Sequence, residues 1–91
     1  MSPAVKEKFK VVKNPEVMGG SARIEGTRVR VMDIVEKYEI LDYSPAEIAE
    51  VFEVSVGEVF QALAYYESHR DEIKSEIRKH EELVKRHKEA A

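Results

Sequence analysis

The chain has 91 residues, a formal net charge of −3 and no cysteine. This length fits a single domain that is too small to enclose a large active-site cavity, and the lack of cysteine excludes disulfide bonds and thiolate metal sites. No run approaches the roughly 20 apolar residues that a membrane span requires. We therefore expect one soluble, cytoplasmic domain.

The charged residues are abundant and unevenly distributed. Residues 1–31 carry seven Lys or Arg against three acids, residues 32–69 carry one Lys against nine acids, and residues 70–91 are nearly balanced. An anionic partner would therefore meet the first part and a basic partner the middle. The richness in Glu, Lys and Arg, with a single Asn and a single Gln, is typical of hyperthermophile proteins and predicts a heat-loving prokaryotic source.

Changes in residue pattern divide the chain into three parts. A tail at residues 1–8 precedes a single domain at residues 9–70, and a C-terminal helix follows at residues 71–91. Within the domain, period-two alternation predicts a β-hairpin at residues 22–31, and helical periodicity predicts three helices at residues 32–68. The expected fold class is α+β, mostly α: an N-terminal strand and β-hairpin, a three-helix bundle and a C-terminal helix.

The strand and the hairpin are predicted from short alternating stretches. In "KFKVV" lysines alternate with apolar residues, and the Asn-Pro pair that follows ends this strand. In the hairpin, "ARIE" and "RVRV" flank the two-residue loop "GT". In this register Arg23 lies opposite Arg30, and Ile24 lies opposite Val29 on an apolar face.

The polar face of this hairpin carries three arginines, Arg23, Arg28 and Arg30. Such a face can contact DNA phosphates or lie in a groove, as β-ribbon proteins do, so these residues are the DNA-binding candidates. The simpler interpretation, which we prefer, is that they solvate the hairpin or pair with the acidic helices.

Two capping boxes predict where the second and third helices begin. Ser44 with Glu47, and Ser55 with Glu58, stand three residues apart, and Pro45 occupies the favoured first helical position. The first helix is predicted from Met32 to about Ile40. Spacing predicts buried faces of Ile34, Val35, Tyr38 and Leu41 in the first helix, of Ile48, Val51 and Phe52 in the second, and of Val56, Val59, Phe60 and Leu63 in the third.

The second and third helices resemble a helix-turn-helix, but their exposed residues are unsuited to DNA. The outward face of the third helix offers Glu58, Gln61 and Tyr65 with no Lys or Arg, and the second helix adds three glutamates. Because phosphate attraction supplies most non-specific DNA affinity, an acidic recognition helix is a serious handicap. We therefore interpret these helices as a scaffold.

The C-terminal helix follows a break near His69 and has a thin apolar seam. This seam consists of Ile73, Ile77 and Val84. It needs a partner, and the apolar face of the hairpin is too small to stand alone, so we expect a compact homodimer.

No residue pattern indicates catalysis or a cofactor. The glycines match neither the P-loop nor the dinucleotide fingerprint, and the glutamates lack a neighbouring nucleophile or base. His80 and His87 are about 10 Å apart along a helix, which is too far for them to share one metal ion. We therefore expect no enzyme activity, no metal and no cofactor.

The stretches "NPEVMGGSARIEGTRVRVMDIVEKYE" and "SPAEIAEVFEVSVGEVFQALAYYESHRDEI" resemble a small prokaryotic family, domain of unknown function 433, which is similar to VapB-type antitoxins of type II toxin-antitoxin systems. The resemblance covers residues 9 to about 73. The positions that carry the family's N-terminal motif are Asn14, Pro15, Gly20, Ile24, Gly26, Thr27 and Arg28. The departures are Ala22 for a proline, Leu41-Asp42 where a glycine is usual, and Phe52-Glu53 for Tyr-Pro.

This resemblance implies a homeodomain-like three-helix bundle in a dimeric antitoxin that binds a PIN-like ribonuclease toxin and its own promoter DNA. Because PIN-like nucleases hold a metal in a carboxylate cluster, cationic side chains of an inhibitor can compete with that metal. The C-terminal helix supplies the toxin-binding candidates, which are Ile73, Ile77, Arg78, Lys79, Val84, Lys85 and Arg86. The alternative function is a DNA-binding transcriptional regulator that has no toxin partner.

Overall fold

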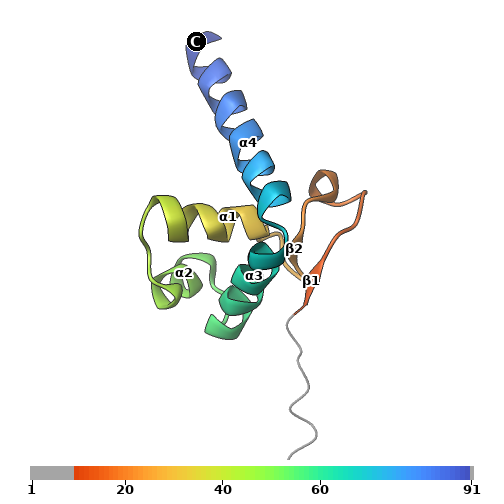
Figure 1. Cartoon of the computed structure of the whole chain (residues 1–91), viewed down its shortest axis with the longest axis vertical. Coiled ribbons are helices and arrows are strands. Elements are labelled where there is room, and N and C mark those ends of the chain that lie inside the picture. The colour runs from red at the N-terminus through yellow and green to blue at the C-terminus, as the bar shows by residue number, and fades with distance from the viewer. Residues whose placement is uncertain (1–9, 91) are drawn as a thin grey trace, which may run out of the picture.

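The computed structural model describes residues 10–90, which form a small body from which one long helix projects (Figure 1). The elements in chain order are β1 (Val11–Val12), the 3-10 turn η1 (Met18–Gly20), β2 (Arg23–Ile24), α1 (Val31–Val35), η2 (Glu36–Ile40), α2 (Pro45–Phe52), α3 (Val56–Ser68) and α4 (Arg70–Ala90). The α+β, mostly α class is confirmed. The predicted tail at residues 1–8 lies outside the described residues.

The sheet has two short strands and one extra bridge. β1 pairs antiparallel with β2, so that Val11 lies opposite Ile24 and Val12 opposite Arg23. At the other edge of β2, Arg23 forms a single bridge with Arg30. This bridge confirms the predicted register of the hairpin, although its second strand is reduced to one residue.

The hairpin turn lies one residue earlier than the sequence predicts. The Thr27 amide donates to the Ile24 carbonyl at 3.0 Å, so Glu25 and Gly26 are the central residues. Gly26 adopts a φ of +79°, which is easy for a residue without a Cβ. The Thr27 hydroxyl donates to the Ile24 carbonyl at 2.8 Å and accepts from the Val29 amide at 3.0 Å. These hydrogen bonds place Glu25 and Gly26 at the centre of the turn, whereas the sequence predicts Gly26 and Thr27 there.

The first helix begins as the chain leaves this bridge. The Asp33 carboxylate accepts the Arg30 backbone N–H at 3.0 Å, which caps the start of α1. The helix then continues as the π-helix η2, in which the Leu41 amide donates to the Glu36 carbonyl at 3.2 Å. Together α1 and η2 cover the span predicted for the first helix.

Both predicted capping boxes are present. The Ser44 hydroxyl accepts from the Glu47 amide at 3.1 Å, and the Glu47 carboxylate accepts from the Ser44 amide at 2.8 Å. The corresponding distances for Ser55 and Glu58 are 3.1 and 2.7 Å. α2 and α3 therefore begin where the sequence predicts.

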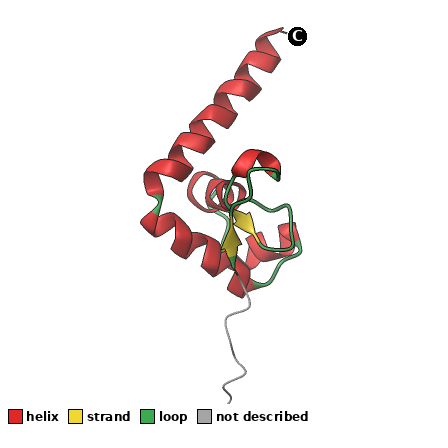
Figure 2. Cartoon of the chain, turned by 90° about the vertical axis from the view of Figure 1, so that its right-hand side faces the viewer, coloured by secondary structure: helices red, strands yellow, loops and turns green. Residues whose placement is uncertain are grey.

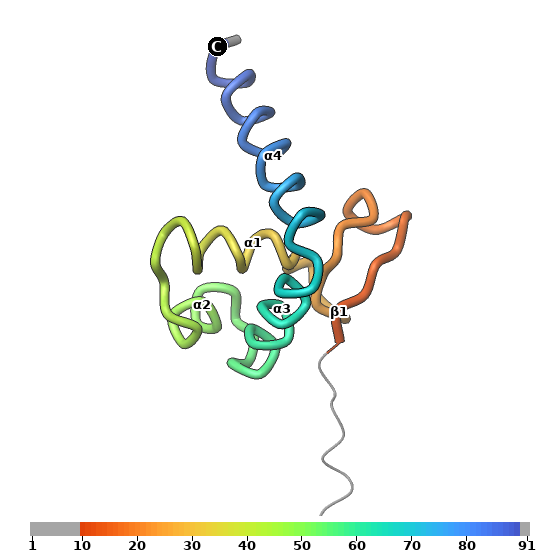
Figure 3. Tube along the Cα trace, viewed as in Figure 1, coloured from red at the N-terminus to blue at the C-terminus, as the bar shows by residue number. Residues whose placement is uncertain are grey.

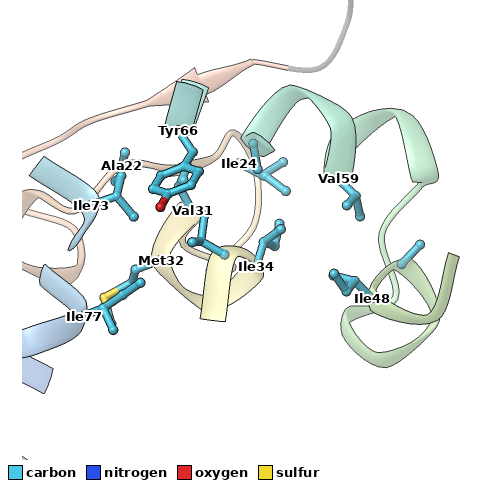
Figure 4. Close-up of a cluster of buried hydrophobic side chains, with 13 residues drawn as sticks. Ala22, Ile24, Val31, Met32, Ile34, Ile48, Val59, Tyr66, Ile73 and Ile77 are labelled. Carbon is cyan, nitrogen blue, oxygen red and sulfur yellow. The ribbon is translucent and has the colours of Figure 1, made fainter. Parts of the chain in front are cut away.

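One apolar core joins the hairpin to all four α-helices (Figure 4). Its fully buried large side chains are Ile24, Val31, Ile34, Val35, Ile48, Val59 and Ile73. Each buried aliphatic side chain of this kind contributes about 1.5 to 3 kcal/mol relative to an exposed one. Ile73 and Ile77 of α4 belong to this core and point toward α1, so the core extends past the predicted domain end at residue 70.

Five residues that the sequence predicts as buried are exposed instead. They are Tyr38, Leu41, Val51, Val56 and Phe60. The wider π turn of η2 changes the direction of the side chains that follow α1. In α3 the buried stripe is rotated to Val59, Ala62 and Tyr66, and the helix packs against both α1 and α2.

Candidate interaction site on the C-terminal helix

α4 leaves the body after its first two turns. The side view shows the helix continuing well beyond the other elements (Figure 2), and the longest dimension of the molecule is 57 Å against 29 and 22 Å. Every residue from Glu81 to Glu89 is exposed. The distal part of α4 is therefore available to another molecule.

Four exposed cations line one side of this helix, which we name the basic stripe. They are Arg78, Lys79, Lys85 and Arg86. Since a helix turns about 100° per residue, Lys79 and Arg86 lie opposite the buried Ile77, whereas Arg78 and Lys85 lie about a quarter turn away from it. Arg86 forms an exposed ion pair with Glu82 at 3.6 Å, which contributes little at this exposure. All four basic toxin-binding candidates are thus exposed, with Lys79 and Arg86 on the side of α4 farthest from the core.

The three apolar toxin-binding candidates do not share that face. Ile73 is fully buried and Ile77 is 7% exposed, so both pack inside their own chain and cannot meet a partner in this conformation. In this part of the helix the seam completes the core of its own chain. Val84 is 44% exposed and its neighbour Leu83 is 64% exposed, so these two apolar side chains remain accessible.

A groove runs along the side of α4 that faces η2. It consists of two adjoining shallow hollows that share Glu81. The hollow nearer the body is lined by Val35, Glu39, Ile40, Tyr66, Lys74, Ile77 and Arg78, and the outer one by Glu36, His80, Val84, Lys85 and Lys88. Ile40 is 54% exposed at its edge. We name this surface the α4 groove.

α4 leaves the body at its junction with α3 (Figure 3), where side chains of the two helices interact. The Tyr65 and His69 rings stack with centroids 3.8 Å apart. His69 Nδ1 lies 2.9 Å from the Tyr65 carbonyl oxygen and donates to it. The Tyr65 hydroxyl donates to the Glu72 carboxylate at 3.2 Å. The junction is therefore held from both helices.

Lys13, which follows β1, ties the N-terminal segment to this junction. Its Nζ lies 2.8 Å from the Glu72 carboxylate. Burial alone would raise the pKa of Glu72, but the hydrogen bond and charge of Lys13, together with the Tyr65 hydrogen bond and the charge of His69, hold that pKa below its ordinary value. The same hydrogen bond raises the pKa of Lys13.

The hairpin arginines have three different environments. Arg30 binds the Asp33 carboxylate through Nε and a terminal nitrogen, each at 3.0 Å, and this hydrogen bonding raises its pKa. Arg23 donates to the Thr27 carbonyl at 3.1 Å, while its Nε is buried without a hydrogen-bond partner. Arg28 is exposed. The three therefore do not form one free cationic face.

The surface of α2 and α3 is acidic, and it has an exposed apolar part that the sequence does not predict. The Glu58 carboxylate is used in the cap of α3, and Glu47, Glu50 and Glu53 remain exposed on or just after α2. Phe60 and Tyr38 share a shallow hollow and are 54% and 42% exposed. Helical spacing places both in the core, so no sequence signal indicates this exposure.

None of the histidines in residues 10–90 belongs to a group of side chains that could hold a metal ion. Within residues 10–90, no group of three His, Asp or Glu side chains is arranged to hold a metal ion. His80 and His87 lie beside Leu83 and Val84 on α4. No helix in the described part of the chain is both long and apolar enough to cross a membrane.

Comparisons with known proteins connect this geometry to a family. The family DUF433, described as a protein of unknown function, matches residues 11–66. The crystal structure of a DUF433 member protein from Anabaena variabilis ATCC 29413 is similar, with a TM-score of 0.66 and 27% identity over 81% of this chain and 71% of that chain. No curated protein matches. The family match ends before α4, so it does not include the basic stripe.

Proposed function

This chain belongs to the DUF433 family, and from that premise and the geometry of α4 we propose that it is a cytoplasmic antitoxin. It binds and neutralises a PIN-like ribonuclease toxin, and its activity is binding rather than catalysis. The similarity of this family to VapB-type antitoxins and the projecting helix support the proposal together.

The basic stripe is the observation that carries this proposal. A nuclease that holds a divalent metal among carboxylates has a strongly negative site. Guanidinium and ammonium groups form short, strong hydrogen bonds with carboxylates. Lys79 and Arg86 lie seven residues apart on the accessible side of α4, so they extend over about two helical turns. A helix of this kind can enter a cleft that the body of the protein cannot reach.

Inhibition of a purified nuclease tests the proposal directly. The nuclease would come from an adjacent reading frame rich in paired aspartates, and the wild-type chain should inhibit its cleavage of RNA. The double variant Lys79→Glu, Arg86→Glu should inhibit at least tenfold more weakly, because both cations become anions. Raising the Mg²⁺ concentration should also weaken inhibition by the wild type.

The matched control is Arg28→Glu, which reverses an exposed cation on the hairpin and should inhibit like the wild type. Full inhibition by the double variant would contradict a role for the basic stripe. The toxin contact would then be sought on the acidic face around Glu47, Glu50 and Glu53, as complementary charge suggests.

The alternative, operator binding without a toxin, has weaker support. Of its three candidate residues, Arg30 is paired with Asp33 and Arg23 is partly buried. Arg28 is exposed, but a single cation supplies only a small part of the phosphate attraction that DNA binding requires. The acidic surface of α2 further opposes a DNA backbone.

A further inference from the structure

α3 leaves an apolar strip exposed on a side that its buried stripe does not use. Val56 and Phe60 lie about one helical turn apart and are 41% and 54% exposed. Ala64 continues the strip one turn later and is exposed as well. Tyr38 of η2 is 42% exposed and lines the same shallow hollow as Phe60, Leu63 and Ala64. We name these five side chains the α3 strip.

Two carboxylates border the α3 strip. Glu39 and Glu67 both line the hollow, and none of the described residues that line it is Lys or Arg. Glu39 accepts the Tyr66 hydroxyl at 2.9 Å through one of its oxygens, which holds this carboxylate at the edge of the hollow. Glu67 pairs with Arg70 at 3.0 Å, but its side chain is 69% exposed, so the ion pair is weak and another cation can replace Arg70.

The surrounding chain adds to this negative charge. Residues 32–69, which include η2 and α3, carry nine acids and one lysine. That lysine, Lys37, lies over the Tyr43 ring with its Nζ 5.7 Å from the ring centroid, and it does not line the hollow. A cationic partner that approaches the α3 strip therefore enters an attractive field, whereas an anionic partner is repelled.

We propose that the α3 strip is the docking surface for a basic, amphipathic helix of a partner protein. The apolar side of that helix covers Phe60 and Tyr38, and its flanking lysines or arginines bind the two carboxylates. The strip from Val56 to Ala64 extends over about 12 Å, which matches two turns of a docked helix. The proposal goes beyond the proposed function, because it concerns a different surface and does not depend on the basic stripe.

Two other occupants match the α3 strip less well. The same face of a second copy would bring Glu39 and Glu67 close to identical carboxylates, and like charges repel each other. DNA would place its phosphates against these carboxylates as well. A basic helix is the occupant for which both the charge and the apolar side match the strip.

Binding of a designed peptide to the full chain tests the proposal. The probe is a fluorescent helix of about 14 residues, or four turns, with leucine on one side and lysine on the other. We expect micromolar binding that Phe60→Ala weakens at least tenfold, because this change removes the large anchor side chain of the contact. The matched control is Leu83→Ala, which removes an exposed apolar side chain of α4 and should bind the peptide like the wild type.

Charge reversal tests the electrostatic part of the contact. Glu67→Lys should weaken peptide binding severalfold. Glu89→Lys changes the net charge equally but lies exposed near the end of α4, so its effect should be much smaller. A peptide with glutamate in place of every lysine should not bind. The double variant Lys79→Glu, Arg86→Glu should bind the leucine-lysine peptide at least as well as the wild type, so failure of the nuclease proposal leaves this one intact.

Three results would overturn the proposal. The first is no binding of the leucine-lysine peptide, and the second is equal binding by the wild type and Phe60→Ala. The third comes from sedimentation and DNA-binding assays of the same two proteins without peptide. A dimer or a DNA complex that Phe60→Ala dissociates would assign the α3 strip to a second copy or to DNA instead.

Discussion

Arg28 and Arg30 are two residues apart but have different roles, and their variants should differ accordingly. Arg30 joins the hairpin to α1 through two hydrogen bonds to Asp33 and through its capped backbone amide. We expect Arg30→Ala to lower the free energy of unfolding by about 1 to 2 kcal/mol. Arg28→Ala should change it by less than about 0.5 kcal/mol. Urea unfolding measures both, and equal losses would contradict the distinction.

The ionised Glu72 carboxylate should raise the free energy of unfolding, and the size of this contribution should depend on pH. Its pKa is held below the ordinary value of 4.5, so its contribution is complete above pH 4.5 and is lost as the pH falls through the lowered pKa. The Lys13 side chain is half exposed, so we expect less than about 1 kcal/mol from this pair. Urea titrations between pH 3 and 7 should therefore show a shallower decline in acid for Glu72→Gln than for the wild type.

Glu89→Gln is the control for that experiment, because Glu89 lies exposed near the end of α4. This variant should follow the wild-type pH profile. If Glu72→Gln follows it as well, the junction carries no pH-dependent stability.

At the scale of the elements, the sequence predicts helix starts better than helix faces. Both capping boxes form as predicted, because they need only a hydroxyl, a carboxylate and three residues of spacing. The face of η2 could not be predicted from a period of 3.6 residues, because its turn is a π turn. The face of α3 depends on how this helix packs against α1 and α2, which is a tertiary property.

Residue periodicity also fails to predict which residues of the candidate site on α4 are buried. The sequence identifies the four basic residues of α4 as candidates, and all four are exposed, although Arg78 and Lys85 also line the α4 groove. The seam, in contrast, has one continuous periodicity but two environments: Ile73 is buried in the core and Val84 is exposed. Periodicity does not reveal where the body ends, so sequence reasoning assigned the whole seam to a partner.

At the scale of the whole molecule, α4 is both a part of the core and a projecting arm. Its first two turns supply Ile73 and Ile77 to the core. In the same region the Ser21 hydroxyl donates to the Glu76 carboxylate at 3.1 Å, which joins the helix to the loop before β2. Within residues 10–90, the part of α4 beyond Ile77 makes no comparable hydrogen bond to the body. It meets the body only through the side chains that line the α4 groove. The boundary between core and arm therefore lies just after Ile77.

Two truncations should locate this boundary. A chain that ends at residue 74 loses Ile77 and the Glu76 contact, and removal of a buried isoleucine side chain alone costs about 2 to 5 kcal/mol. Since a small domain has only about 5 to 15 kcal/mol of stability, this chain should be largely destabilised. A chain that ends at residue 81 keeps the core and should unfold within a few degrees of the full chain in a thermal melt. It should nevertheless inhibit the nuclease more weakly, because it lacks Lys85 and Arg86 of the basic stripe. A cooperative, equally stable melt of the shorter chain would place the boundary before Ile77 and contradict the assignment of that residue to the core.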